Sequence, residues 1–407
     1  MIEASHAVLL HDRRIGSILQ RGDVARFVFT DGYWEDPDRN VLGLWFEDDP
    51  RRSPKAASRL PPWFSNLLPE GYLRSWIAHA QGVSADRELQ LLLRIGRDLP
   101  GAVQVIAADH EQFDPALLAD SGSFTLGGTS EENQWKFSLA GVSLKFSMLK
   151  KKERFTIPSS NTLGDWIVKL PDPHYPQVPN NEYATMKLAC SVGINTPEIA
   201  LVHRDELSVL PDHVWPGGEE WAYTVSRFDR TPTGQRIHIE DLAQVRGFYD
   251  DAKYCGSFET VAALLYRGYD RESLHEFVRR LTFNLLIGNG DAHLKNWSLI
   301  YPNKRVPAIS PAYDLVSTGP YAATHAPDDF GLTFGGTKVM ERIKRYDFVQ
   351  LQHRLGVESV DIVDILDKTI ESFVNSWRNG AAENFPWFVS QWIEDHSTRI
   401  ISNLSPR

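Results

Sequence analysis

Short apolar runs alternate with charged residues and glycine at the start of the chain. This pattern is typical of a β-meander and predicts three strands between residues 7 and 30. Apolar residues at helical spacing come next and predict helices over 65–80 and 86–95. A polar stretch rich in Gly, Ser and Thr then interrupts the apolar pattern. We therefore predict one unit over residues 1–118 and a linker over 119–134.

The pattern of the chain changes after the linker. Strict alternation of apolar and polar residues over 142–148 predicts a strand, and further strands are predicted at 166–170 and 221–225. Apolar stripes at helical spacing dominate the rest of the chain. Strands followed by helices indicate an α+β fold with two lobes. The predicted lobes are a β-rich N-lobe over 135–230 and an all-α C-lobe over 231–407.

Composition is that of a globular protein, since 42% of the 407 residues are hydrophobic and 24% are charged. The net charge of −10 disfavours direct, non-specific binding to nucleic acid. The two cysteines are too few for a disulfide framework or a zinc cluster. Charged residues interrupt any N-terminal signal sequence, and no apolar run reaches the roughly 18 residues of a membrane span. We therefore expect a cytoplasmic protein.

The segment NGDAHLKN at 289–296 carries the most informative candidate chemistry. Asp291 and Asn296 have the D-x-x-x-x-N spacing of kinase catalytic loops, in which the Asp accepts the proton of the substrate hydroxyl and the Asn binds Mg²⁺. Because Mg²⁺ requires several oxygen ligands, a second ligand is needed. Asp314 in the motif PAYDL is our candidate. We predict that all three residues are catalytic and that Asn296 and Asp314 hold the metal.

The phosphates of ATP require a cation on a rigid element. Lys169 lies in the apolar strand 166–170 and fits this role, with Glu182 on the next helix as its acidic partner. Ser226 and Phe228 follow a strand at the point where a hinge would hold adenine. The turn and strand upstream of Lys169 are predicted to form a lid over the phosphates. The ATP-binding candidates of this lid are Ser138, Gly141, Ser143 and Lys145.

Each of these pieces also has a structural explanation when it is taken alone. The D-x-x-x-x-N spacing recurs by chance, and Lys169 fits an edge lysine that discourages strand aggregation. The lid sequence is well short of a G-x-G-x-x-G loop. A loop histidine such as His293 more often packs than binds a ligand. The order and spacing of all the pieces together favour a nucleotide site.

The chain resembles the HipA-type serine/threonine kinases, the toxins of HipA–HipB type II toxin–antitoxin modules. The resemblance rests on NGDAHLKN together with PAYDLVS at 311–317. Further motifs in the family's order are PWFSNLLPEG (62–71), LLLRIGRDLPGAV (91–103), WIVKLP (166–171), VSRFDR (225–230) and FGLTFGGTK (330–338). The resemblance implies a two-lobed protein-kinase-like fold with an additional N-terminal α/β subdomain. His293 and Tyr313, which lie inside the two leading motifs, join the ATP-binding candidates.

The resemblance also implies an ATP- and Mg²⁺-dependent kinase that phosphorylates an aminoacyl-tRNA synthetase, such as glutamyl-tRNA synthetase, and so halts translation. It implies self-inactivation by autophosphorylation of Ser138, and a HipB-like antitoxin through which alone the chain would contact DNA. Two positions depart from the family pattern, because Ser143 stands where Gln is usual and Ser226 stands where Glu is frequent. Since Ser143 and Ser147 also lie on the lid, the choice among its serines stays open.

Two other functions stay open. The loop G-D-x-H-x-x-N is also found in aminoglycoside- and choline-type phosphotransferases, which act on small molecules but do not need the N-terminal unit. A catalytically silent, antitoxin-binding co-repressor is the second alternative. The presence of Asp291, Asn296, Asp314 and Lys169 argues against lost catalysis.

Overall fold

The computed structural model describes residues 4–107, 145–151, 154–156, 163–207, 210, 215–216, 218–322 and 329–406. The predicted linker lies outside these ranges, as do the predicted lid residues Ser138, Gly141 and Ser143. The other candidate site residues lie within them.

The N-terminal unit is built on a five-stranded antiparallel sheet with the order β4-β3-β2-β1-β5. Its strands are β1 (Ala4–Leu10), β2 (Arg13–Arg21), β3 (Val24–Phe29), β4 (Lys55–Ala57) and β5 (Val103–Ala107). Its helices are α1 (Leu44–Glu47), α2 (Pro62–Ser65), α3 (Gly71–Ala80) and α4 (Glu88–Ile95). The predicted meander is confirmed, but the helix predicted over 65–80 is wrong as a single element. It is broken between α2 and α3, because Pro69 lacks an N–H group and Gly71 adopts a positive φ of 52°.

A second antiparallel sheet has the order β7-β6-β8-β10-β9. Its strands are β6 (Lys145–Lys151), β7 (Arg154–Thr156), β8 (Trp166–Lys169), β9 (Ile199–His203) and β10 (Trp221–Ser226), and helix α6 (Val178–Ser191) packs against β9 and β10. The strands predicted at 166–170 and 221–225 are confirmed. Phe146 and Val168 of this sheet share one hydrophobic core with Trp63 and Leu91 of the N-terminal unit. The N-terminal unit is therefore packed onto the N-lobe by apolar burial.

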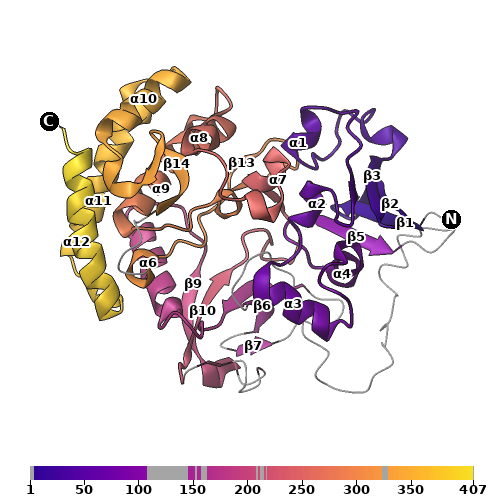
Figure 1. The fold of residues 1–407 in the computed structure, drawn as a ribbon, viewed down its shortest axis with the longest axis horizontal. Coiled ribbons are helices and arrows are strands. Elements are labelled where there is room, and N and C mark those ends of the chain that lie inside the picture. The colour runs from indigo at the N-terminus through magenta and orange to yellow at the C-terminus, as the bar shows by residue number, and fades with distance from the viewer. Residues whose placement is uncertain are drawn as a thin grey trace.

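The remainder of the chain is mainly helical. It contains α7 (Leu242–Arg246), α8 (Phe258–Tyr266), α9 (Arg271–Ile287), α10 (Arg345–Leu355), α11 (Val363–Arg378) and α12 (Trp387–Leu404). Figure 1 places α10, α11 and α12 at the opposite end of the molecule from β1, β2 and β3. No described helix has the length and hydropathy of a transmembrane span.

Two short antiparallel sheets correct the expectation that the C-lobe is all-α. One pairs β11 (His238–Asp241), β12 (Ser298–Tyr301) and β13 (Ala308–Ile309), and the other pairs β14 (Asp329–Phe334) with β15 (Thr337–Val339). Strand β12 directly follows the segment NGDAHLKN. Its buried backbone groups need partners, which β11 and β13 supply on its two sides. The small sheet thus fixes the downstream end of the candidate catalytic loop.

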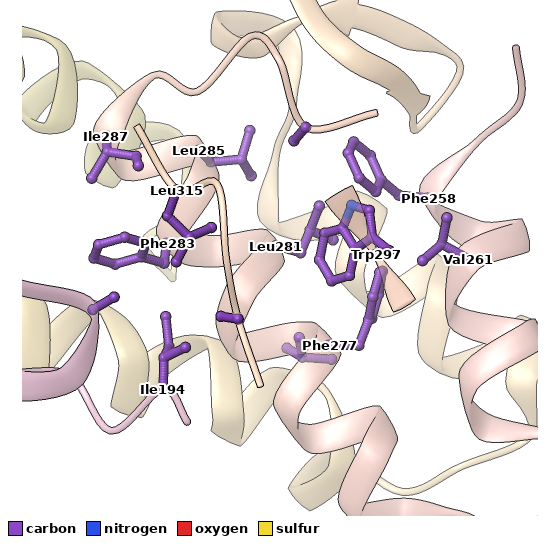
Figure 2. Close-up of a cluster of buried hydrophobic side chains, with 14 of the residues drawn as sticks. Ile194, Phe258, Val261, Phe277, Leu281, Phe283, Leu285, Ile287, Trp297 and Leu315 are labelled. Atoms are coloured by element: carbon purple, nitrogen blue, oxygen red, sulfur yellow. The ribbon is translucent and has the colours of Figure 1, made fainter. Parts of the chain in front are cut away.

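Helix α9 is the centre of the C-lobe core. Phe277, Leu281 and Leu285 of α9 are fully buried and lie in one cluster with Trp297 and Leu315, as Figure 2 shows. Trp297 follows Asn296 directly, and Leu315 follows Asp314 directly. The same core therefore anchors α9 and the chain next to both predicted metal ligands.

Candidate active site

The predicted catalytic loop begins where α9 ends. Gly288 caps the helix with a left-handed φ of 64°, and its backbone N–H bonds the carbonyls of the last turn. The side-chain amide of Asn289 then donates to the side-chain oxygen of Asn284 at 2.8 Å, and the backbone N–H of Asp291 donates to Oδ1 of Asn289 at 3.0 Å. The backbone of Asp291 is thus held by buried amides, while its carboxylate is 48% exposed. A partly exposed carboxylate on a fixed backbone is suited to accept a proton from a bound hydroxyl.

The side chain of Asn296 is oriented by the same loop. Its Nδ2 donates to the backbone carbonyl of Asp291 at 2.8 Å. This bond uses the nitrogen end of the carboxamide and leaves Oδ1 as the end that can bind a cation. The spacing predicted from the sequence therefore closes the loop on itself, because it lets Asn296 reach back to Asp291.

Lys169, Glu182 and Asp314 form a partly buried ionic cluster between the two lobes. Nζ of Lys169 lies 2.6 Å from Oε1 of Glu182 and also pairs with Oδ1 of Asp314. Lys169 comes from β8, Glu182 from α6 and Asp314 from the C-lobe, where a positive φ of 53° turns the chain sharply. An L-residue tolerates this backbone only where its surroundings fix it, and Asp is one of the residue types that does so most readily. The predicted pairing of Lys169 with Glu182 is present in the structure.

The charged groups of this cluster shift each other's pKa values. Burial would lower the pKa of Lys169, but Asp314 and Glu182 outweigh burial and raise it. Burial would likewise raise the pKa of Asp314, yet Lys169 and Lys145 hold it well below its usual range. For Glu182, burial dominates and the pKa is raised in spite of Lys169. Asp314 is therefore a carboxylate at neutral pH, and Lys169 is an ammonium.

Lys145 is a second cation beside the cluster. It pairs in register with Lys169 across β6 and β8, so both side chains lie on the same face of the sheet. Lys145 is only 6% exposed and makes no ion pair within the described ranges. Burial lowers its pKa, against the attraction of Asp314. A buried lysine without an ion pair in the described part of the chain is suited to receive an anion such as a phosphate, because a nearby negative charge favours its protonated form.

The donor set between the lobes fits a Mg²⁺ ion with a nucleotide. Asn296, Tyr313 and Asp314 line one pocket. Among the described residues, no hydrogen bond reaches Oδ1 of Asn296 or Oδ2 of Asp314, since Asn296 donates through Nδ2 and Lys169 engages Oδ1 of Asp314. Carboxylate and amide oxygens are the ligands that Mg²⁺ takes together with phosphate oxygens. Asn296 and Asp314 would hold the metal, and Lys169 and Lys145 would face the phosphates.

Ser226 and Phe228, the two residues of the predicted adenine site, both contact other residues of the protein. The backbone N–H of Ser226 donates to the carbonyl of Glu198 at 2.8 Å. The ring of Phe228 lies 5.6 Å from the ring of Tyr313, centroid to centroid. The hydroxyl of Tyr313 donates to the carbonyl of Lys295 at 2.8 Å. Tyr313 therefore offers a ring face rather than a hydroxyl to a ligand.

His293 is a buried side chain that lies next to both Tyr254 and Asp291. It is 6% exposed, its ring lies edge-on to the ring of Tyr254 at 5.0 Å, and its Nε2 is 3.8 Å from Oδ1 of Asp291. Burial lowers its pKa, although Asp291 acts to raise it. The imidazole of His293 is therefore neutral at pH 7 and lies beside the carboxylate of Asp291.

Three contacts of the site were not predicted. Tyr254 donates its hydroxyl to Asp291, and Lys295 of the loop binds the N-terminal unit. Arg227, next to the hinge, is ion-paired with Asp98 of the N-terminal unit. The motif NGDAHLKN contains Lys295 and draws attention to it, but its partner lies 225 positions away in the sequence, so no local pattern connects the two. Tyr254 carries no sequence signal.

Comparisons with known proteins cover both parts of the chain. Residues 6–106 match the HipA N-terminal domain, and residues 137–377 match the HipA-like C-terminal domain. A protein of Sinorhizobium fredii with the name "Putative kinase Y4dM" is 41% identical over 387 residues, which cover 92% of this chain and 91% of the relative. The serine/threonine-protein kinase toxin HipA of Shewanella oneidensis is 27% identical over 303 residues, covering 65% and 64%.

The fold has a solved counterpart. The structure of HipA from Shewanella oneidensis MR-1, in complex with HipB and operator DNA, superposes with a TM-score of 0.71 at 20% identity and covers 98% of this chain and 97% of that chain. The predicted two-lobed fold with an additional N-terminal subdomain is thereby confirmed.

Proposed function

The chain belongs to the HipA family, and from this premise we propose that it is an ATP- and Mg²⁺-dependent serine/threonine protein kinase. The observation that carries the proposal is the cluster of Lys169, Glu182 and Asp314 next to the loop of Asp291 and Asn296. These five side chains come from both lobes: Lys169 pairs with Glu182 and Asp314, and the side chain of Asn296 bonds the backbone of Asp291.

The residues divide the work of phosphoryl transfer. Asp291 orients the substrate hydroxyl and accepts its proton, because its carboxylate is exposed while its backbone is fixed. Lys169, kept charged and oriented by Glu182, binds phosphate oxygens. Asn296 and Asp314 hold Mg²⁺, which when bound neutralises charge on the phosphates. Lys145 lies in the same low-dielectric space, where the negative charge of a bound phosphate would favour its protonated form and electrostatic stabilisation is strong.

The family further suggests a toxin of a type II toxin–antitoxin module acting in the cytoplasm. We propose a HipB-like antitoxin as partner, because the matching Shewanella structure is of HipA with HipB and operator DNA. An antitoxin of this kind would supply the DNA contacts that a chain with a net charge of −10 is poorly suited to make. The proposed substrate is an aminoacyl-tRNA synthetase, and the proposed self-inactivation is autophosphorylation of Ser138. We propose domains at 1–118, 135–230 and 231–407, with the linker 119–134.

Phosphate transfer with purified components tests the function. The protein is incubated with labelled ATP, Mg²⁺ and a panel of aminoacyl-tRNA synthetases, and labelled products are mapped by mass spectrometry. Asp291→Ala should reduce transfer by several orders of magnitude, since positioning and charge stabilisation supply most of such catalysis. Asp205→Asn, at a side chain that is 84% exposed, is the matched control and should leave transfer unchanged.

Two results would contradict the proposal. Undiminished transfer by the Asp291→Ala variant would remove Asp291 from its role. ATP turnover that responds to small hydroxylated compounds and to no protein would favour a small-molecule phosphotransferase instead.

A further inference from the structure

Lys295 lies inside the catalytic loop, yet its ammonium group faces the N-terminal unit. Its Nζ is 3.0 Å from Oε1 of Glu70, 2.9 Å from Oδ1 of Asn66 and 3.2 Å from the backbone carbonyl of Asn66. A longer ion pair of 3.6 Å joins it to Oδ2 of Asp241 in the C-lobe. Lys295 is 7% exposed and Glu70 is 6% exposed. The contact is therefore a buried, multiply bonded junction between two parts of the chain that are remote in sequence.

Both partners of Lys295 are themselves fixed. The amide of Asn66 donates to the carbonyl of Phe248 at 2.6 Å and to the carbonyl of Pro62 at 2.9 Å. Glu70 also pairs with Lys253 at 2.8 Å. Burial would raise the pKa of Glu70, but Lys295 and then Lys253 outweigh burial and lower the pKa to about 2. Glu70 is thus a carboxylate shared by two buried cations.

The backbone of Lys295 transmits this fixed position to the metal site. Asn296, a proposed metal ligand, is the next residue. The carbonyl of Lys295 accepts the hydroxyl of Tyr313 at 2.8 Å, and Tyr313 directly precedes Asp314, the other proposed ligand. A shift of the Lys295 backbone would therefore move both metal ligands.

The ion pair of Arg59 with Asp250 lacks this connection. Arg59 pairs with Asp250 at 2.7 Å across the same interface, but Asp250 belongs to a surface turn outside the catalytic loop. Variants of these two contacts can therefore distinguish two roles of the interface. The Arg59–Asp250 pair only joins the N-terminal unit to the C-lobe, whereas the Lys295–Glu70 pair also positions the catalytic loop.

We propose that the N-terminal unit is a positioning part of the active site, in which Glu70 and Asn66 hold Lys295 and so set the geometry of the catalytic loop. Glu70, Asn66 and Lys295 are positioning residues, since they act through Asn296 and Tyr313. The effect on turnover rests on the proposed kinase function, whereas the effect on loop order does not.

Hydrogen exchange and kinetics on the full chain test this inference together. The variants are Glu70→Gln, Lys295→Met and the control Asp250→Asn, which removes one carboxylate partner of Arg59 and none of the ion-pair partners of Lys295. We expect faster exchange of the backbone amides of 289–297 in the first two variants. We also expect kcat to fall by roughly 10- to 100-fold, because small misplacements of catalytic groups have effects of this size. The KM for ATP should change much less, since Lys169 and Lys145 are untouched.

The outcomes are distinguishable. Asp250→Asn should leave both loop exchange and kcat as in the unchanged protein. Equal effects of all three variants would show that the Lys295 contact only holds the two parts together, and would overturn the proposal. Unchanged exchange in Glu70→Gln and Lys295→Met would overturn it as well. If the unchanged protein transfers no phosphate, the function fails, while the exchange data still decide whether the N-terminal unit orders the loop.

Discussion

The hydroxyl of Tyr254 donates a hydrogen bond to Oδ1 of Asp291 at 2.5 Å. Tyr254 is 40% exposed, so the contact lies at the surface where a substrate would approach. Burial raises the pKa of this phenol, and the negative charge of Asp291 raises it further, so the hydroxyl keeps its proton and remains a donor. The bond fixes the carboxylate and leaves Oδ2 for the substrate hydroxyl.

Removal of this hydroxyl should slow the reaction. In Tyr254→Phe the carboxylate of Asp291 loses its orienting donor, and hydrogen bonds to charged groups contribute about 1.5–3 kcal/mol. Because the site is partly exposed, we expect the lower end of this range and about a tenfold lower kcat. Steady-state kinetics with a protein substrate measure the change, with Tyr269→Phe, at a side chain that is 63% exposed, as control. A higher kcat/KM in Tyr254→Phe would mean that the hydroxyl blocks the substrate instead.

Glu182 should act on ATP affinity through Lys169. In Glu182→Gln the buried ammonium of Lys169 loses a charged partner at 2.6 Å and is drawn onto Asp314, which would then be less available to a metal ion. We expect the KM for ATP to rise by about tenfold or more, since removal of one partner of a buried pair has large effects. Glu198→Gln in the same lobe is the control, because that side chain is 71% exposed. An unchanged KM for ATP in Glu182→Gln would show that Lys169 needs no acidic partner.

Local patterns in the sequence were sufficient for much of the architecture. The alternation around Phe146 and Met148 predicted β6, and the stripe through Phe277 and Leu281 predicted α9, because periodicity reports directly which face is buried. The spacing of Asp291 and Asn296 predicted a loop that the structure closes by a hydrogen bond. These are short-range relationships, and a single sequence contains them.

Long-range contacts could not be predicted in the same way. The ion pair of Glu70 with Lys295 joins residues from different parts of the fold, and no periodicity encodes it. The pairing of β12 with β11 was not predicted, because β11 lies far upstream in the sequence. The lid serines Ser138 and Ser143 lie outside the described residues, and their roles stay predictions.

Glu240 should give the protein a pH-dependent stability. It is fully buried, and its carboxyl accepts bonds from the backbone N–H of Leu44 and the indole of Trp63 in the N-terminal unit. Burial raises its pKa to about 7 from 4.5, although hydrogen bonds oppose this shift. The folded state therefore binds the proton more tightly than the unfolded state does. Its stabilising contribution is complete below pH 4.5 and is lost as the pH rises to about 7.

The free energy of unfolding measures this effect. Over that pH range we expect the unchanged protein to lose on the order of 3 kcal/mol relative to Glu240→Gln, whose amide does not titrate. Denaturant unfolding at a series of pH values, with the exposed Glu383→Gln as control, gives the difference. Parallel pH profiles for the unchanged protein and Glu240→Gln would show that Glu240 has a similar pKa in both states.

A buried charge cluster joins the N-terminal unit to the segment after β10. Oδ1 of Asp98 accepts from Arg227 at 2.9 Å and from Arg230 at 3.0 Å, and both guanidinium groups also bind Asp229 at 2.8 Å. The four side chains are between 0% and 8% exposed. The two guanidinium groups and the two carboxylates thus balance each other's charges in a place where water does not solvate them.

Because Asp98 balances the charge of two buried arginines, its substitution should lower the free energy of unfolding. Asp98→Asn removes one of the two carboxylates that, within the described residues, face the two buried guanidinium groups. Breaking a buried pair from one side costs about 3–5 kcal/mol. We expect this loss in the free energy of unfolding, measured by denaturant titration. Asp205→Asn, at an exposed side chain, should stay within about 0.5 kcal/mol of the unchanged protein. A loss in Asp98→Asn no larger than in that control would mean that water or Asp229 alone satisfies both arginines. Because Arg227 directly follows the predicted hinge residue Ser226, the same variant should also weaken ATP binding.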